Sequence, residues 1–261
     1  MAWIQVHCRS AQLKMPVDFQ VLMPQHNPGG GRGAVKSKGP YKALYLLHGL
    51  GGSGTEWLRN TSLERHMNKI PMAVVLPDGH NSFWTNMTTG SDYHNYITQE
   101  LPEICEKWFN ISQRREDRYI AGISMGGYGA LNAALNRPGV FSKVAAISPV
   151  TDMALFFGRD DLTVKPEWIF GGYEKYASGS DNLLIAANNL AQSSGEERPE
   201  ILLTCGHGDG FHQPTLSFKE HLDGLGIKNE FYDTEGEHDW EYGDMAIKKV
   251  IDWLGVEKEE D

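Results

Sequence analysis

The sequence is poor in cysteine and has no long hydrophobic run, and each absence excludes a class of protein. Only Cys8, Cys105 and Cys205 occur among 261 residues, and an odd set without regular spacing is neither a disulfide framework nor a zinc ribbon. No apolar stretch approaches the roughly 18 residues that a membrane helix needs. The N-terminal segment has no basic region followed by an uninterrupted apolar stretch, so it does not resemble a signal peptide. We therefore expect a cytoplasmic protein that does not bind membranes.

Positive charge is also scarce. The chain has 24 basic against 34 acidic residues and a net charge of -10. This balance opposes the field needed to hold phosphate backbones or anionic lipid, so nucleic-acid binding is not expected. A hydrophobic content of 40% is ordinary for a globular protein that buries a large core, and the length suits one α/β domain spanning residues 1–261.

Short apolar runs alternate with segments of helical periodicity along most of the chain. Strands are expected at Trp3–Arg9, Val17–Met23, Ala43–Leu47, Met72–Leu76, Arg118–Ala121, Lys143–Ile147, Glu200–Thr204 and Lys228–Asp233. Helices are expected at Glu56–Asn68, Tyr93–Phe109, Met125–Asn136, Pro214–Leu225 and Trp240–Leu254. This alternation predicts an α/β fold with a mostly parallel eight-stranded sheet covered on both faces by helices. The first two strands have no helix between them, which is typical of an antiparallel edge.

Two stretches interrupt this order. Residues 25–40 are rich in glycine and predict an exposed loop or hairpin. Residues 149–195 contain a weakly helical piece, Asp181–Gln192, and several aromatic side chains including Phe156 and Phe170. A long insert in a compact domain is usually functional or disordered, and the aromatic residues favour a small cap over a site. Such a cap could also support a homo-oligomer.

A G-x-S-x-G motif, Gly122-Ile-Ser124-Met-Gly126, follows one expected strand and opens an expected helix. The motif alone can occur by chance in a chain with 29 glycines. Its position is more specific, because a strained turn between strand and helix exposes a nucleophilic serine at the end of a sheet. The helix N-terminus also favours developing negative charge. The alternative is a serine that only caps a helix after a glycine turn.

The segment His48-Gly-Leu-Gly-Gly-Ser53 follows the third expected strand. In a serine hydrolase built on such a sheet, the loop after this strand and the residue after the nucleophile supply the oxyanion donors. These would be the backbone N–H groups of Leu50 and Met125. A phosphate-binding loop is disfavoured because neither G-x-x-x-x-G-K-[ST] nor G-x-G-x-x-G is present. We expect His48 to be structural, hydrogen-bonded within its loop.

Chain order selects the base and the acid. Of ten histidines, His238 follows the last expected strand, where the base of such an enzyme lies. Asp209 is the carboxylate that follows the seventh strand, while Asp233 and Asp239 are rivals on either side of the base. The alternative for His238 is an ordinary surface histidine in an acidic turn.

A metal site is the competing interpretation of the loop after the seventh strand. His207, Asp209 and His212 could together hold a metal ion. Their spacing fits no recurrent zinc signature, and a loop with two glycines would hold ligands loosely. The sequence therefore predicts no metal.

The chain resembles the putative esterase group of α/β-hydrolases, which includes tributyrin, feruloyl and acetyl-xylan esterases, S-formylglutathione hydrolase and mycolyl transferases. The likeness runs nearly end to end and is carried by LYLLHGLGGSGTEWLRNTSLERHM, VLPDGHNSFWTNMTTGSDYHNYITQELP, YIAGISMGGYGALNAAL and GEHDWEYGD. The second and last segments look most like the tributyrin and feruloyl esterase branch. The formylglutathione branch usually carries a cysteine in the loop after HGL, which this chain lacks.

The resemblance implies the α/β-hydrolase fold and cleavage of small carboxylic esters, with short acyl or cinnamoyl-type groups, without metal or cofactor. It carries the triad onto Ser124, Asp209 and His238 and the oxyanion donors onto Leu50 and Met125. The flanks of Asp209, HG before and GFH after, depart from the usual acidic and aliphatic neighbours. The resemblance places an acyl pocket at Trp57, Phe83 and Trp84, although each could equally be a core residue. An acyltransferase and a non-catalytic ligand-binding relative are the alternative functions.

Overall fold

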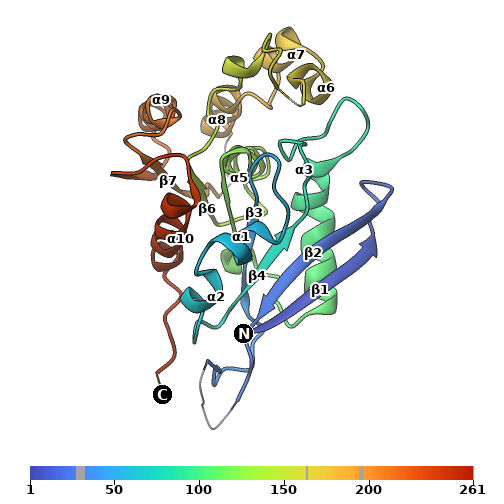
Figure 1. The fold of residues 1–261 in the computed structure, drawn as a ribbon, viewed down its shortest axis with the longest axis vertical. Coiled ribbons are helices and arrows are strands. Elements are labelled where there is room, and N and C mark those ends of the chain that lie inside the picture. Colours follow the sequence, from blue (N-terminus) through green and yellow to red (C-terminus); the bar gives the residue numbers. More distant parts are fainter. Residues whose placement is uncertain (28–32, 163, 194–196, 261) are drawn as a thin grey trace.

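A mostly parallel sheet of eight strands forms the centre of the protein (Figure 1). The computed structural model describes residues 1–27, 33–162, 164–193 and 197–260. The strands are β1 (Ala2–Arg9), β2 (Pro16–Met23), β3 (Lys42–Leu47), β4 (Met72–Pro77), β5 (Arg118–Ile123), β6 (Lys143–Ile147), β7 (Glu200–Gly206) and β8 (Asn229–Thr234). Their order is β1-β2-β4-β3-β5-β6-β7-β8. The pairs β1–β2 and β2–β4 are antiparallel and the pairs from β4 to β8 are parallel. The predicted α/β sheet with an antiparallel edge is confirmed.

Helices cover both faces of the sheet. They are α1 (Glu56–Asn60), α2 (Leu63–His66), α3 (Tyr93–Asn95), α4 (Leu101–Trp108), α5 (Met125–Asn136), α6 (Pro166–Phe170), α7 (Tyr173–Ser178), α8 (Leu183–Gln192), α9 (His212–Gly224) and α10 (Trp240–Leu254). The described residues also contain a π-helical turn (Tyr96–Glu100) and two 3₁₀ turns (Arg115–Asp117 and Met153–Phe156). None of the helices in the described ranges is long and apolar enough to cross a membrane.

The central strands are buried on both faces, so side chains at alternate positions pack into two separate hydrophobic cores. In β5, Ile120 packs into the core beneath α4, α5, α8 and α9, whereas Tyr119 and Ala121 pack into the core beneath α1, α2 and α10. This alternation follows from the two-residue period of a strand. Near-continuous apolar runs are thus explained by burial on both sides of a parallel sheet.

Two predicted helices are interrupted in the structure. The expected helix over residues 56–68 is two short helices, because Thr61 has extended backbone and ends α1. The expected helix over residues 93–109 contains the π-helical turn directly before Pro102. Proline has no N–H and its ring clashes with a carbonyl one turn earlier, so it is tolerated only in the first turn of a regular α-helix, which is where Pro102 stands in α4.

The insert over residues 149–195 forms α6, α7, α8 and the 3₁₀ turn Met153–Phe156, apart from its residues 163, 194 and 195, which lie outside the described part. Its helices gather at one end of the molecule, at the top of Figure 1. Helix α8 packs on α5, and the Tyr128 hydroxyl of α5 donates a hydrogen bond to the carbonyl of Asp181, 2.6 Å away.

Of the predicted loop over residues 25–40, residues 28–32 likewise lie outside the described part.

Candidate active site

Ser124 occupies the turn between β5 and α5, with φ 57° and ψ -116°. An L-residue rarely adopts a positive φ, so this backbone is strained and must be held by its surroundings. The Ser124 N–H donates to the carbonyl of Ile147 at 2.9 Å, and the Tyr128 N–H donates to the Ser124 carbonyl at 3.0 Å. The turn is therefore tied both to β6 and to the first turn of α5.

Two glycines of the motif allow this turn to close. A Cβ atom on Gly122 would lie 2.4 Å from backbone atoms of Gly126, and one on Gly126 would lie 2.5 Å from the carbonyl oxygen of Leu47. Neither position has room for a side chain, because the obstructing atoms are backbone. The G-x-S-x-G pattern is thus a packing requirement, and it brings α5 against the end of β3.

The three side chains predicted as a triad lie in one hydrogen-bonded chain. The Ser124 hydroxyl is 3.1 Å from Nε2 of His238, and Nδ1 of His238 is 2.8 Å from Oδ2 of Asp209. With its proton on Nδ1, the imidazole donates to the carboxylate and accepts from the serine hydroxyl. This arrangement can remove a proton from Ser124 and stabilise the imidazolium that results.

Asp209 is buried, with 5% of its surface exposed. Burial raises the pKa of its carboxyl, but hydrogen bonds from His238 and from the Phe211 N–H outweigh this and lower the pKa below the ordinary value. The rival carboxylates have other partners. Asp239 accepts from the Tyr242 N–H at 2.9 Å and caps α10, and Asp233 binds two other histidines.

The two residues predicted to supply the oxyanion donors lie at the same cavity as Ser124. Leu50 and Met125 both line it, and within the described residues neither backbone N–H has a hydrogen-bond partner. Met125 is the first residue of α5, where an N–H has no acceptor within the helix. A Cβ on Gly49 would lie 3.5 Å from Cβ of Ser124, so the Leu50 loop runs directly beside the nucleophile turn.

His48 has the structural role predicted for it. Its Nε2 accepts from the Gly79 N–H at 2.9 Å and its Nδ1 donates to the Gly49 carbonyl at 2.7 Å. Burial lowers the pKa of this ring, which keeps it neutral. Because one nitrogen accepts and the other donates, His48 links the Leu50 loop to the loop after β4.

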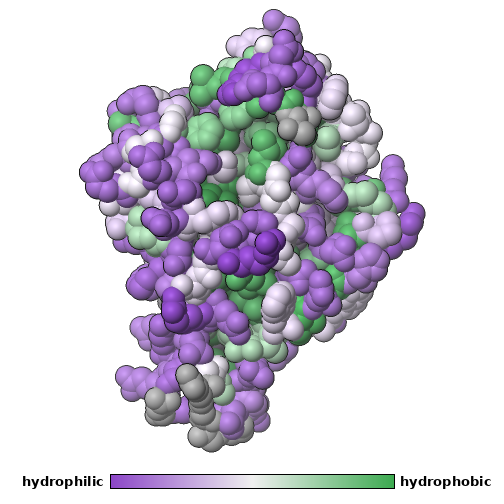
Figure 2. All heavy atoms as spheres, in the orientation of Figure 1, coloured by the Kyte–Doolittle hydropathy of each residue, from purple (hydrophilic) through white to green (hydrophobic). Residues whose placement is uncertain are grey.

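A cavity of about 370 Å³ opens at Ser124 and is lined mainly by apolar side chains. The lining residues are Gly49, Leu50, Phe83, Ile123, Ser124, Met125, Val150, Phe156, Phe211, His238, Asp239 and Trp240. Figure 2 shows hydrophobic residues reaching the surface beneath the helical insert. Such a site suits an apolar ligand oriented by a few polar groups.

Trp57 and Trp84, predicted to form the acyl pocket with Phe83, do not line this cavity. Both are fully buried. The Trp57 indole N–H donates to the Leu47 carbonyl at 3.1 Å, and Trp84 packs against Gly129 of α5. That prediction is corrected: both indoles lie in the core, where the Trp84 N–H donates to the His48 carbonyl at 3.3 Å, since a buried indole N–H usually has a hydrogen-bond partner.

Phe211 and Trp240 also line the cavity, although the sequence did not predict them there. Each follows a predicted triad residue by two positions, Phe211 after Asp209 and Trp240 after His238. The Phe211 ring lies 5.1 Å from the His238 ring, centroid to centroid. Proximity to the triad along the chain was therefore the signal that could have found them.

Gly206→Ala should impair the site, whereas Gly210→Ala in the same loop should not. A Cβ on Gly206 would lie 2.3 Å from the carbonyl oxygen of Gly236, but one on Gly210 would meet no atom within 4 Å. Alanine at position 206 must push apart the loops that carry Asp209 and His238. We expect a fall in the thermal unfolding midpoint, since overpacking costs about 1–3 kcal/mol, and a fall in kcat of at least about tenfold. Differential scanning calorimetry and ester hydrolysis would measure both, and equal behaviour of the two variants would contradict the prediction.

Comparisons with known proteins agree with this geometry. The profile of the family described as "Putative esterase" matches residues 10–247. An acetyl esterase of Caldicellulosiruptor saccharolyticus is 27% identical over 262 residues, which covers 97% of this chain and 98% of that protein. The substrate-bound fluorophosphonate-binding serine hydrolase F of Staphylococcus aureus is 30% identical with a TM-score of 0.88, and the S-formylglutathione hydrolase of the same organism is 30% identical with a TM-score of 0.85. Both alignments cover 97% of this chain and 98% of the other. The chain therefore belongs to the putative esterase family of α/β-hydrolases.

Proposed function

We propose that the protein is a serine carboxylesterase that hydrolyses small carboxylic esters through an acyl-enzyme on Ser124. The observation that carries this proposal is the continuous chain of hydrogen bonds from Ser124 through His238 to Asp209, at the wall of an apolar cavity. The similarity to an acetyl esterase supports a short acyl group.

Acylation begins when the Ser124 hydroxyl attacks the ester carbonyl and gives its proton to Nε2 of His238. Asp209 holds the ring with its proton on Nδ1 and stabilises the imidazolium. The N–H groups of Leu50 and Met125 bind the oxyanion, and loss of one such donor typically costs about 3–4 kcal/mol of barrier. The imidazolium then protonates the leaving alcohol, and the acyl group stays on Ser124.

Deacylation repeats these steps with water as the nucleophile. His238 removes a proton from the water as it attacks the acyl carbonyl, and the same N–H groups bind the second oxyanion. The proton then returns to the Ser124 oxygen as the carboxylic acid leaves. Each residue is used twice, and no group outside the chain is needed to balance either step.

The apolar wall favours an ester with at least one apolar side, either a short aliphatic or a cinnamoyl-type acyl group. We propose that residues 149–195 act as a cap, because Val150 and Phe156 of this insert line the cavity. The Phe156 ring stacks on Phe211 with centroids 6.1 Å apart and meets the edge of Phe83 at 6.1 Å. Phe156 thus packs the insert against Phe83 and Phe211, both of which line the cavity.

A panel of 4-nitrophenyl acetate, butyrate and octanoate with methyl ferulate tests the proposal. We expect the wild-type protein to hydrolyse at least one ester with kcat/KM of about 10⁴ M⁻¹s⁻¹ or more. Phe156→Ala should raise the ratio of octanoate to butyrate rates by roughly 3- to 10-fold, because removal of the ring lengthens the apolar cavity.

Leu155→Ala is the matched control for the cap prediction. Leu155 is adjacent in sequence but half exposed, and it lines a different groove, between the insert and α9. It should leave the chain-length ratio unchanged. An unaltered ratio in Phe156→Ala would contradict the proposed role of the cap, and failure of the wild-type protein to hydrolyse any ester of the panel would contradict the esterase proposal.

A further inference from the structure

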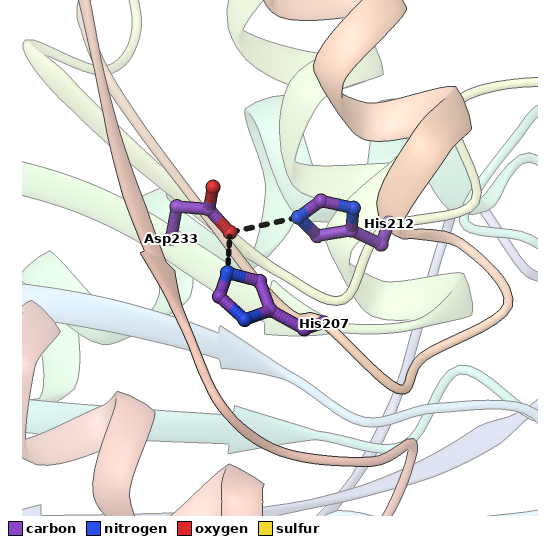
Figure 3. A group of neighbouring side chains, drawn as sticks. All are labelled: His207, His212 and Asp233. Atoms are coloured by element: carbon purple, nitrogen blue, oxygen red, sulfur yellow. Dashed lines mark hydrogen bonds and ion pairs between the residues drawn. The ribbon is translucent and has the colours of Figure 1, made fainter.

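Three side chains suited to binding a metal converge beside the candidate active site (Figure 3). His207 comes from the loop after β7, His212 is the first residue of α9, and Asp233 lies near the end of β8. Their ligand atoms all lie within 4.8 Å of one another. The parallel pairing of Cys205 with Asp233 brings the end of β8 beside this loop.

Both imidazoles point their Nε2 atoms at one carboxylate oxygen. The distances to Oδ1 of Asp233 are 2.9 Å from His207 and 2.7 Å from His212, and the two rings stand at 90° to each other. Tetrahedral zinc with bonds of about 2.0–2.1 Å separates its ligand atoms by roughly 3.3 Å. Each of the two nitrogen–oxygen distances would therefore have to lengthen by about half an ångström to admit the ion.

An outer carboxylate supports one of these ligands. Nδ1 of His207 lies 3.1 Å from Oε1 of Glu235, so this ring can donate to Glu235 while its Nε2 binds a metal. Metal-bound histidines commonly donate their second ring N–H to a carboxylate, which fixes the tautomer and orients the ring. The cluster thus contains two nitrogen ligands, one oxygen ligand and an orienting group.

We propose that His207, His212 and Asp233 bind a first-row divalent cation of the Zn²⁺ type, outside the reacting centre. Two imidazoles with one carboxylate suit zinc, nickel or copper, whereas Mg²⁺ prefers oxygen ligands. His207 and Asp233 are about half exposed, so water can complete the coordination. Sequence spacing offers Asp209 as the third ligand, but the Asp209 side chain is buried and turned to His238. Asp233, from a neighbouring strand, takes that place.

The site would act as a clamp on the loop that carries the candidate acid. His207 and His212 bracket Asp209 and Phe211 in sequence, and Asp233 anchors both histidines to β8. Metal binding would therefore fix both ends of this loop and stabilise the folded state. The binding site itself does not depend on the esterase proposal.

Isothermal titration of the chelator-treated full chain with ZnCl₂ tests this inference. We expect one site of micromolar or tighter affinity, no comparable binding of MgCl₂, and a rise in the thermal unfolding midpoint on the order of 5 °C at a hundredfold excess over Kd. Asp233→Asn should weaken Zn²⁺ binding at least about tenfold. Asparagine keeps an oxygen that can accept hydrogen bonds but lacks the charge, so the fold need not suffer.

Asp18→Asn is the matched control, because Asp18 pairs with His7 at 2.8 Å on an exposed surface. It should leave Zn²⁺ binding unchanged, as should His238→Asn, which removes the candidate base. Absence of Zn²⁺ binding to the wild-type chain would overturn the inference. Equal affinity of Asp233→Asn and the wild-type chain would overturn it too, as would loss of binding in His238→Asn, which would place the metal at the triad.

Discussion

Replacing Ser124 by alanine should lower kcat for every hydrolysed ester by about four orders of magnitude or more. Without its hydroxyl no acyl-enzyme forms, and His238 has no nucleophile to activate. The Leu50 and Met125 donors remain, so a small residual rate above that of the uncatalysed reaction is expected. The fold should survive, because the substitution removes only the 3.1 Å hydrogen bond to His238.

Ester hydrolysis and intact mass spectrometry would measure this effect together. The wild-type chain treated with a fluorophosphonate should gain the mass of one phosphonyl group, and Ser124→Ala should gain none. Ser53→Ala is a suitable control, since Ser53 lies in the Leu50 loop and its hydroxyl bonds with Thr55 and not with a candidate triad residue. If Ser124→Ala retained wild-type rates, the nucleophile assignment would be wrong.

The helix bounds predicted most accurately belong to helices that begin at a strained turn or at a capping residue. The bounds of Met125–Asn136 and Trp240–Leu254 agree with the structure. The first follows the strained turn at Ser124, and the second is capped by Asp239. The expected helix over residues 56–68 had no such signal at its middle. There, tertiary contacts determine where one helix ends and the next begins. There the Ser62 N–H donates to Asp244 of α10 at 2.6 Å, which helps to fix the break between α1 and α2.

Chain order predicted the triad candidates because the fold fixes which strand each of them follows. Chain order could not distinguish cavity-lining from core aromatic residues, since Trp57 and Phe211 are both large aromatic side chains that a fold can bury or place at a cavity. Trp57 lies behind Trp240, with ring centroids 5.2 Å apart, and of these two rings Trp240 lines the cavity. Which ring of such a pair faces the ligand depends on packing across the sheet and not on local pattern.

The cluster of His207, His212 and Asp233, which we propose as a metal site, shows the same limit. His207 and His212 are close in sequence, but Asp233 joins them through the register of β7 with β8. A search for ligand spacing within one loop cannot find a ligand that a neighbouring strand supplies. The nearest carboxylate in sequence, Asp209, is the one that the loop turns away.

Asp209→Asn should lower kcat by roughly 10⁴-fold while leaving the shape of the site intact. The amide nitrogen would donate to Nδ1 of His238, which forces the ring proton onto Nε2. In that tautomer His238 can no longer accept the Ser124 proton, and no carboxylate stabilises an imidazolium. Steady-state hydrolysis in the presence of EDTA would measure this loss.

The two rival carboxylates provide the controls. Asp233→Asn and Asp239→Asn should each retain kcat within about threefold, because Asp233 bonds elsewhere and asparagine also caps helices well. Loss of activity in Asp239→Asn with none in Asp209→Asn would reassign the acid.

Unfolding experiments add a second test of Asp209. Its folded pKa lies below the ordinary value, so its charged form contributes stability above the unfolded pKa of about 3.9, and this contribution is lost as pH falls through the folded pKa. Urea unfolding should therefore show the wild-type chain more stable than Asp209→Asn at pH 7, with the difference narrowing below about pH 4. A difference independent of pH would mean that the carboxylate is not held in its charged form by His238 and the Phe211 N–H. The triad would then lack the charge that stabilises its imidazolium.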